Sequence, residues 1–176
     1  MTGRVRPATE ADARSIAEVH VRAWRWAYRE LLPAAHLAGL SVDARAQMWR
    51  RSLAAPAPST RLLVWDQDGG IRGFVAYGPA RDEDAPARES GKLYALYLDE
   101  DLLGRGAGRA LHDAALDALR AAGFAGAVLW VLEDNARGRA FYARRGWAPD
   151  GPRRSDSFGG EHGDAHRRAI RLARRL

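Results

Sequence analysis

The 176-residue chain, with a mass of 19.3 kDa and 47% hydrophobic residues, is long enough to form one domain whose core needs no disulfide or metal. Its net charge of +6 favours an anionic partner, but charge alone does not distinguish nucleic acid from a phosphate-bearing cofactor. It has no cysteine, which excludes disulfides, thiol nucleophiles and cysteine-ligated zinc. It has no run of the ~20 apolar residues that cross a membrane, and residues 1–14 contain no signal-peptide apolar region. We therefore expect a soluble cytoplasmic protein.

The first half of the chain predicts two helices and three strands. Thr9 can cap the first helix, with Asp12 in the capping-box position, and apolar residues then recur at helical spacing until Pro33. Ser41 is the candidate cap of the second helix. The segment "QDGG" at 67–70 is a hairpin signal between two strands. The predicted elements are a strand at 4–6, helices at 8–32 and 41–54, and strands at 61–66 and 71–78.

The second half alternates strands with helices, which is typical of an α/β protein with a mixed sheet. A polar, acid-rich loop at 79–90 comes first. The run at 126–132 is almost wholly apolar, as in a strand buried on both faces, and Gly123 stands where a helix C-cap glycine belongs. After residue 150 the pattern predicts a loop or strand, a glycine-rich turn and a last strand. The predicted elements are strands at 92–98, 126–132 and about 166–172, and helices at 108–123 and 136–146.

Residues 103–111, "LGRGAGRAL", place three glycines between a predicted strand and a predicted helix. Backbone N–H groups in such a turn can point at an anion, and a helix N-terminus adds roughly half a positive charge. The alternative is a tight turn that needs glycine only for its backbone angles. A dinucleotide fingerprint would need glycine in place of Arg109 or Leu111, and a Walker loop would need a lysine that this stretch lacks. The spacing therefore disfavours NAD and ATP.

Two motifs resemble those of the GNAT acyltransferase superfamily. Arg105 to Gly108 fits the family's acyl-CoA pyrophosphate pattern Gln/Arg-x-x-Gly-x-Gly/Ala, although Leu103 replaces its first residue. The stretch Asn135 to Trp147, "NARGRAFYARRGW", begins 27 residues beyond Gly108 and is similar to the signature Asn-x-x-Ala-x-x-Phe-Tyr-x-x-x-Gly-Phe/Trp. Its alanine comes one or two residues later than in many members. A small amphipathic helix explains the core residues of this stretch, but not the pairing of the two motifs.

The resemblance extends from Val5 to about Leu172 and implies one GNAT acetyltransferase domain over 1–176. It implies an α/β fold with a mixed, mostly antiparallel central sheet of six to seven strands, one parallel pair that splays apart, and about four flanking helices. The implied activity is transfer of an acetyl group from acetyl-CoA to a primary amine by direct attack in a ternary complex. The acceptor is a small molecule or a peptide that the sequence does not identify, and the donor chain could be longer than acetyl.

The family's donor site falls on the strand at 92–98, on the glycine loop and on the helix after Asn135. The amides of Leu96 and Leu98 are expected to pair with the pantetheine arm, with the Leu98 amide polarising the thioester carbonyl. The glycine loop is expected to bind the pyrophosphate mostly through backbone amides. The implied cofactor-binding residues are Leu96, Leu98, Leu103, Gly104, Arg105, Gly106, Ala107, Gly108, Arg109, Asn135 and Tyr142.

Tyr142 occupies the family's position for the general acid that protonates the leaving thiolate. The alternative is a tyrosine whose hydroxyl only orients the cofactor sulfur. The acceptor amine must also lose a proton, to a base or to a water relay. Glu133 is the candidate base, although capping of the following helix explains this residue at least as well. Tyr94, Tyr97 and His20 are the other candidates, and none dominates.

The first predicted helix carries aromatic residues for the acceptor. Trp24 and Tyr28 are four residues apart and share one helix face, in the region that lines the acceptor pocket of similar proteins. With Tyr94 they are the expected substrate-binding residues, and core packing is the alternative for Trp24. The five histidines show no metal-ligand spacing, so we expect no metal.

Two other classes of function stay open. A catalytically silent GNAT-fold sensor or regulatory module that binds acyl-CoA is compatible with Leu103 and with the lack of a clear base. Nucleic-acid binding through the arginines has no zinc pattern, helix-turn-helix signal or aromatic RNA-binding motif to support it, so we expect neither a nucleic-acid nor a membrane partner. The last predicted strand could pair across a homodimer.

Overall fold

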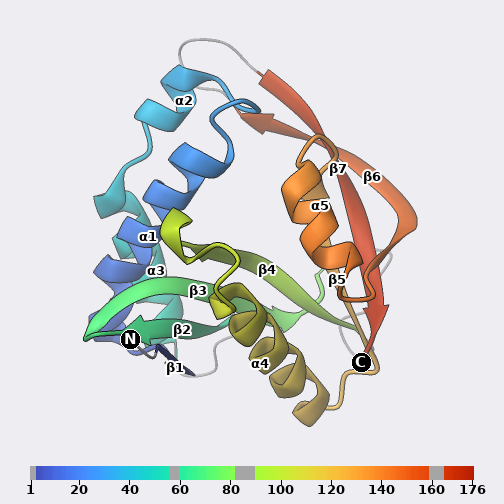
Figure 1. Ribbon diagram of the computed structural model, residues 1–176, viewed down its shortest axis with the longest axis horizontal. Helices are drawn as coiled ribbons and strands as arrows, with labels where there is room; N and C mark the ends of the chain where they lie inside the picture. The colour runs from blue at the N-terminus through green and yellow to red at the C-terminus, as the bar shows by residue number, and fades with distance from the viewer. Residues whose placement is uncertain (1–2, 56–59, 82–89, 159–164) are drawn as a thin grey trace.

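The computed structural model describes residues 3–55, 60–81, 90–158 and 165–176, so most of the loop predicted at 79–90 lies outside the described residues. These residues form a seven-stranded sheet in the order β1-β2-β3-β4-β5-β7-β6 (Figure 1). Neighbouring strands are antiparallel except for β4 and β5, which are parallel. The strands are β1 (Arg4–Pro7), β2 (Arg61–Gln67), β3 (Gly70–Pro79), β4 (Ser90–Leu98), β5 (Gly126–Leu132), β6 (Ala148–Phe158) and β7 (Ala165–Arg175).

Helices cover both faces of the sheet (Figure 1). α1 and α3 pack on one face, in a core cluster that includes Ile16, Trp49 and Phe74. α4 packs on the other face through Leu111 and Leu119. The helices are α1 (Ala13–Ala27), α2 (Ala34–Ala38), α3 (Val42–Ala54), α4 (Ala107–Ala121) and α5 (Ala136–Ala143), with 3-10 turns at Glu10–Asp12 and Glu100–Leu102.

The capping residues behave largely as their sequence positions predict. The Asp12 carboxylate accepts a hydrogen bond from the Thr9 backbone amide at 2.8 Å, but this capping box opens a 3-10 turn that precedes α1. The Ser41 hydroxyl accepts from the Ala44 amide at 3.1 Å and caps α3. These local polar contacts fix where the two N-terminal helices begin.

The single helix predicted at 8–32 is wrong at its C-terminal end. The carbonyl of Tyr28 accepts hydrogen bonds from the amides of both Leu31 and Leu32, at 2.9 Å each, and this turn ends α1. Pro33 then precedes α2, a five-residue helix that the sequence pattern does not predict. The number of α-helices in the described residues is therefore one more than the four expected.

β4 and β5 pair only over their first halves. Their register runs from Ser90 opposite Gly126 to Leu93 opposite Leu129, whereas β3 stays paired with β4 as far as Leu98. β5 is held on its other side by β7 along its whole length. The two parallel strands therefore diverge, which confirms the predicted splayed pair and leaves one edge of β4 open beyond Leu93.

The start of β4 fixes the position of α4. A Cβ atom added to Gly91 would lie 2.7 Å from Cδ2 of Leu119, so only glycine allows this close approach of helix and strand. α4 runs from there so that its N-terminal end lies beside the C-terminal end of β4 (Figure 1). A Cβ at Gly108 would lie only 3.4 Å from Cδ2 of Leu98, which agrees with this placement. The close contact at Gly91 therefore positions α4 so that the glycine loop before it lies beside the open edge of β4.

Candidate active site

A cavity of about 800 Å³ lies where β4 and β5 diverge. Its walls come from the C-terminal end of α1, from β4 and β5, from α5 and from the C-terminal half of β6. The fold thus brings together side chains from both ends of the sequence. The predicted site residues that line it are Trp24, Tyr28, Tyr94, Leu96, Leu98, Leu103, Asn135 and Tyr142.

The open edge of β4 presents backbone amides to this cavity. The amide of Asp99 donates to the carbonyl of Arg72 on β3 at 2.9 Å. N–H groups alternate in direction along a strand, so the Tyr97 amide also faces β3. The amides of Leu96 and Leu98 consequently face the open side, where β5 has already diverged. A polar extended molecule can add to this edge as a further strand does.

The glycine loop forms the turn into α4. Gly104 and Gly106 have positive φ angles of 72° and 91°, a conformation that L-residues with a side chain rarely adopt. The Ala110 amide makes the first intrahelical hydrogen bond, to the Gly106 carbonyl at 2.9 Å. The amides of residues 107–109 come before that bond and point along the positive end of the helix dipole, an arrangement suited to a phosphate.

Most of the predicted pyrophosphate loop does not line the cavity itself. Leu103, which is 37% exposed, borders the cavity, and residues 104–109 follow it into the turn and the first turn of α4. Arg105 is exposed, and Arg109 pairs with Asp113 at 3.4 Å on the helix surface. The loop therefore lies next to the cavity and presents backbone N–H groups and two exposed arginines.

Asn135 is the N-cap of α5. Its side-chain oxygen accepts a hydrogen bond from the Gly138 amide at 2.9 Å, and the residue also lines the cavity. A Cβ at Gly138 would lie 2.7 Å from the Asn135 side-chain nitrogen, so this tight cap requires glycine three residues later. The cap fixes the start of the helix that carries Tyr142.

Tyr142 lies against a wall of aromatic rings. Its ring centroid is 5.2 Å from that of Phe141 and 5.9 Å from that of Trp147. Burial raises the pKa of the Tyr142 hydroxyl far above its usual value of 10, and the nearby Tyr97 adds to this effect. The Tyr142 hydroxyl is therefore neutral at physiological pH.

Two further tyrosines meet in the same cavity. The hydroxyl oxygens of Tyr28, the C-cap residue of α1, and Tyr97 on β4 are 3.3 Å apart and hydrogen-bonded. Burial raises the pKa of both hydroxyls above 10. His20 stacks on the Tyr97 ring with centroids 5.2 Å apart, and burial lowers the pKa of this histidine to about 3. His20 is therefore neutral and lies behind Tyr97 in the core.

The two other predicted acceptor residues have different environments. Trp24 packs edge-on against Tyr28, and its buried indole N–H has no hydrogen-bond partner among the described residues. Arg45 lies 5.6 Å over the Trp24 ring. The Tyr94 hydroxyl, in contrast, donates to the carbonyl of Pro79. Both rings line the cavity, but the indole N–H of Trp24 is itself buried.

Glu133, the carboxylate named as candidate base, is held away from the three tyrosines. Its carboxylate pairs with Arg168 at 3.1 Å and with Arg153 at 3.7 Å, and its backbone amide donates to the Arg168 carbonyl. It is absent from the residues that line the cavity over the described parts of the chain. The geometry gives this residue a role in joining β5 to β6 and β7.

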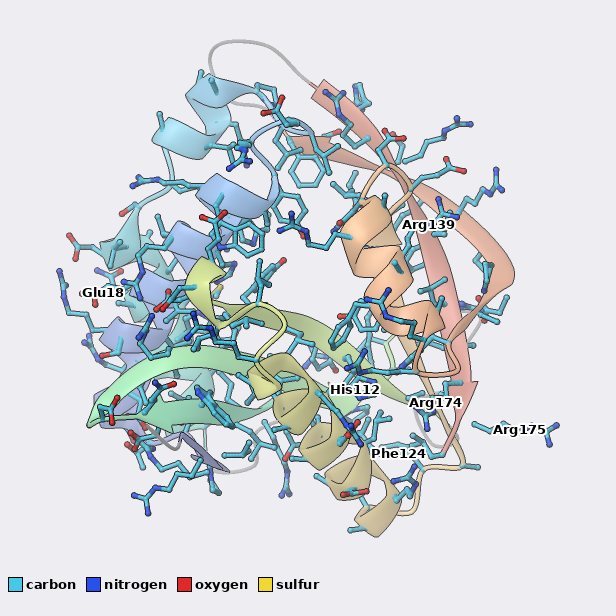
Figure 2. All side chains as sticks on the ribbon, in the orientation of Figure 1. Glu18, His112, Phe124, Arg139, Arg174 and Arg175 are labelled. Atoms are coloured by element: carbon cyan, nitrogen blue, oxygen red, sulfur yellow. The ribbon has the colours of Figure 1, made fainter. Side chains whose placement is uncertain are left out.

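The sequence patterns miss one polar group behind the site. His112 on α4 is fully buried and accepts a hydrogen bond at Nε2 from the Trp147 indole N–H, at 2.9 Å. Its Nδ1 lies 2.7 Å from an oxygen of Asp113. Figure 2 shows His112 on the side of α4 that faces α5. The Trp147 ring that it holds is the one against which Tyr142 packs.

Within the described ranges, no three histidine or acidic side chains gather closely enough to hold a metal ion. In the same residues, no helix is long and apolar enough to cross a membrane.

An open β4 edge that leads to a glycine turn, opposite a partly buried tyrosine on α5, is the arrangement that the resemblance to GNAT acyltransferases implied. The sequence model of the acetyltransferase (GNAT) family matches residues 18–147. The chain therefore belongs to the GNAT acetyltransferase family, as its two motifs predicted.

Individual relatives agree with this assignment. The chain is 36% identical over 132 residues to the uncharacterized N-acetyltransferase YuaI of Bacillus subtilis, covering 74% of this chain and 72% of that protein. It is 47% identical over 64 residues to the mycothiol acetyltransferase of Beutenbergia cavernae, covering 36% of this chain and 22% of that protein. The PaiA N-acetyltransferase of Thermoplasma acidophilum, solved with coenzyme A, shares the fold over 100% of both chains, with a TM-score of 0.77 at 17% identity.

Proposed function

We propose that this acetyltransferase moves an acetyl group from acetyl-CoA to a primary amine, by direct attack of the amine in a ternary complex. The observation that carries the proposal is the open edge of β4, whose amides at Leu96 and Leu98 have lost their strand partner beside the glycine loop. The amide groups of a pantetheine arm can form hydrogen bonds with this edge, as an added strand does. The coenzyme A bound to the PaiA enzyme supports the choice of donor.

In this proposal acetyl-CoA is a substrate, and it supplies the acyl group. The amides that begin α4, together with Arg105 and Arg109, bind its pyrophosphate, because a helix N-terminus attracts phosphate. Leu96 and Leu98 hold the pantetheine, and the Leu98 amide donates to the thioester oxygen as charge develops there. Asn135 and Leu103 border the channel.

Tyr142 is the general acid in this mechanism. The amine nitrogen bonds to the carbonyl carbon, the carbon–sulfur bond breaks, and the Tyr142 hydroxyl gives its proton to the leaving sulfur. The aromatic wall formed by Trp24, Tyr28 and Tyr94 receives the acceptor at the other end of the cavity. Glu133 is not assigned as the base, because its carboxylate already pairs with Arg153 and Arg168.

Two measurements test the proposal. In a thermal-shift experiment, saturating acetyl-CoA or CoA should raise the melting temperature by roughly 5–10 °C, since a ligand at 100 times its Kd stabilises a fold by about 2.7 kcal/mol. NAD and ATP should give no comparable shift. Release of free thiol from acetyl-CoA across a panel of primary amines then tests turnover. Stabilisation without turnover of any amine would instead support a silent acyl-CoA sensor.

The role of Tyr142 has its own test. Tyr142→Phe keeps the ring that packs on Trp147 and removes the hydroxyl, so kcat should fall by about 100-fold while the KM for acetyl-CoA changes little. A variant with unchanged kcat would limit Tyr142 to orienting the donor.

A further inference from the structure

We propose that Tyr97 and Tyr28 form the path by which the acceptor amine loses its proton, with Tyr97 as the group that contacts the reacting nitrogen. This inference rests on the acetyl transfer proposed above and adds the step for which the family motifs name no residue in this chain. It follows from the position of Tyr97, from the hydrogen bond between the two hydroxyls, and from the environment of the acidic side chains around the cavity.

The position of Tyr97 is fixed by the open edge of β4. Residue 97 stands between Leu96 and Leu98, the two residues whose amides face the site of the donor. Its side chain leaves the strand toward α1, on the side of the core that includes His20 and Phe74. The Tyr97 hydroxyl thus lies between the donor edge and the helix whose aromatic residues line the acceptor end.

The hydroxyls of Tyr97 and Tyr28 are 3.3 Å apart, which is within hydrogen-bonding distance. A neutral tyrosine hydroxyl can accept one hydrogen bond and donate another, so two in sequence can pass a proton without forming a charged residue. Burial keeps both hydroxyls neutral, because it raises the pKa of each above 10. Tyr28 is the C-cap residue of α1, and the exposed Arg29 and Glu30 follow it at the cavity wall.

The acidic residues that line the described part of the cavity are poorly placed to act as a base. Glu30 has a side chain 86% exposed to solvent, and Asp134 is an exposed residue after β5. Asp156 forms an ion pair with Arg154 at 2.8 Å. These carboxylates are exposed or paired with an arginine, which leaves a tyrosine hydroxyl as the proton acceptor for a nitrogen held near Tyr97.

The titratable groups that face the tyrosine pair come from three helices. His20 lies on α1 and is neutral, because burial lowers its pKa to about 3. Arg45 on α3 adds a positive charge near Tyr97, and Tyr142 on α5 is a neutral hydroxyl. Neither His20 nor Tyr142 exchanges a proton near pH 7, which leaves the hydroxyl pair as the path among these groups.

The proposed reaction returns every protein group to its starting protonation state. The neutral amine attacks, the carbon–nitrogen bond forms and the nitrogen becomes positively charged. That nitrogen gives a proton to the Tyr97 oxygen while the Tyr97 proton moves to the Tyr28 oxygen and the Tyr28 proton moves to a solvent water. The carbon–sulfur bond breaks, Tyr142 protonates the sulfur, and a proton from solvent restores Tyr142. The net change is amine plus thioester to amide plus thiol.

The test compares Tyr97→Phe and Tyr28→Phe with Tyr77→Phe in the full-length enzyme. Tyr77 is a buried tyrosine of β3 that does not line the cavity, so it controls for loss of a buried hydroxyl. We expect kcat to fall by about 100-fold in Tyr97→Phe and by about 10-fold in Tyr28→Phe, with the KM for acetyl-CoA unchanged. The control should keep the kcat of the parent enzyme.

The pH profile supplies a readout that a structural role would not change. With hydroxyls as the path, the acid limb of kcat/KM for the acceptor should move with the pKa of the amine used. A break at one fixed pH for all amines would reveal a carboxylate or histidine base and overturn the proposal, as would an unchanged kcat in Tyr97→Phe. If the parent enzyme acetylates no amine at all, the proposed function fails first.

Discussion

His112 and Trp147 form a buried polar pair that joins α4 to the turn between α5 and β6. The indole N–H donates to Nε2 of His112 at 2.9 Å, and the histidine has 0% exposed surface. Asp113 accepts from the other ring nitrogen, which fixes the tautomer that can receive the indole proton. Burial is the main cause of the lowered pKa of His112, so the neutral ring is stable in this position.

Removal of both partners of this pair should cost less than the two single removals added together. His112→Leu leaves a buried indole N–H without an acceptor, and Trp147→Phe leaves Nε2 without a donor; each should lower the free energy of unfolding by about 1–3 kcal/mol. The double variant loses both polar groups, so its cost should be smaller than the sum of the two single costs. Urea unfolding of the four proteins measures this; strictly additive costs would show that the hydrogen bond carries no coupling.

His20 makes the stability of the fold dependent on pH. Its usual pKa of 6.5 falls to about 3 in the folded protein, where Trp24, Trp49, Phe74 and Tyr97 surround the ring. Below pH 6.5 the unfolded chain therefore binds a proton that the folded chain does not bind. Stability is complete above the unfolded pKa and is lost as the pH falls toward the folded one.

The expected slope from His20 is about 1.4 kcal/mol per pH unit, so about 2 kcal/mol should be lost between pH 6.5 and pH 5. His112 adds a slope of the same sign, since its pKa is lowered too. Urea unfolding at several pH values measures the total dependence of the unfolding free energy on pH. His20→Phe should reduce its slope by about 1.4 kcal/mol per pH unit, the contribution of one proton. If this variant kept the full slope, His20 would be protonated within the folded protein.

The residues of the candidate site differ in whether the sequence alone can identify them. Tyr142 and Asn135 belong to a local pattern, so the sequence was sufficient to single them out. Tyr97 could be named only as one of several base candidates, because its hydrogen bond to Tyr28 spans 69 residues. The contact of His112 with Trp147 spans 35 residues and leaves no periodic signal. Contacts between distant residues depend on the folded topology, which one sequence does not reveal.

At the scale of elements, the glycine loop needs glycine for its backbone angles and not for lack of room for a side chain. Gly104 and Gly106 have positive φ, and a Cβ atom at either would meet nothing within 4 Å. The same is true of Gly123, which follows the other end of α4 and has a φ of 86°. The two ends of one helix therefore offer a matched pair of glycines, one beside the donor site and one remote from it.

Gly106→Ala and Gly123→Ala should each destabilise the fold by about 1–2 kcal/mol, because L-alanine is strained at positive φ. Only Gly106→Ala should also raise the KM for acetyl-CoA, since the strain would turn the amides of the first turn of α4 away from the phosphates. Thermal unfolding and steady-state kinetics of both variants measure the two effects. An equal rise of KM in Gly123→Ala would mean that overall stability, and not loop shape, controls donor binding.

The elements themselves were largely predictable, with two instructive exceptions. Short apolar runs located β2, β3, β4 and β5, because much of each strand is buried in the sheet. The end of α1 was misplaced because residues 28–32 continue the helical composition while their hydrogen bonds turn back on Tyr28. β6 could only be called a loop or strand, because most of its residues are exposed and it pairs on one side only, with β7.

At the scale of the whole molecule, the site exists because β5 separates from β4 while it stays paired with β7. β5 pairs with β4 for four residues on one side and with β7 for seven residues on the other, so β7 draws it away from β4. The family resemblance predicted this divergence, whereas composition and periodicity predicted only the strands. The acceptor end also needs α1 and β6 to meet across the cavity, and this contact brings Phe158 to 6.1 Å from Trp24.

Donor binding should therefore protect one edge of one strand and leave the rest of the sheet unchanged. Residue-resolved amide hydrogen exchange, measured with and without CoA, should slow at Leu96 and Leu98, whose N–H groups face the open side of β4. The amides of Tyr97 and Asp99 face β3 and should be protected in both states. Alternating protection along a single strand is expected only if the pantetheine adds to that edge as a strand does. Uniform slowing along β4 and β7 would indicate general stabilisation of the fold by ligand, and equal protection by NAD would contradict a site built for acyl-CoA.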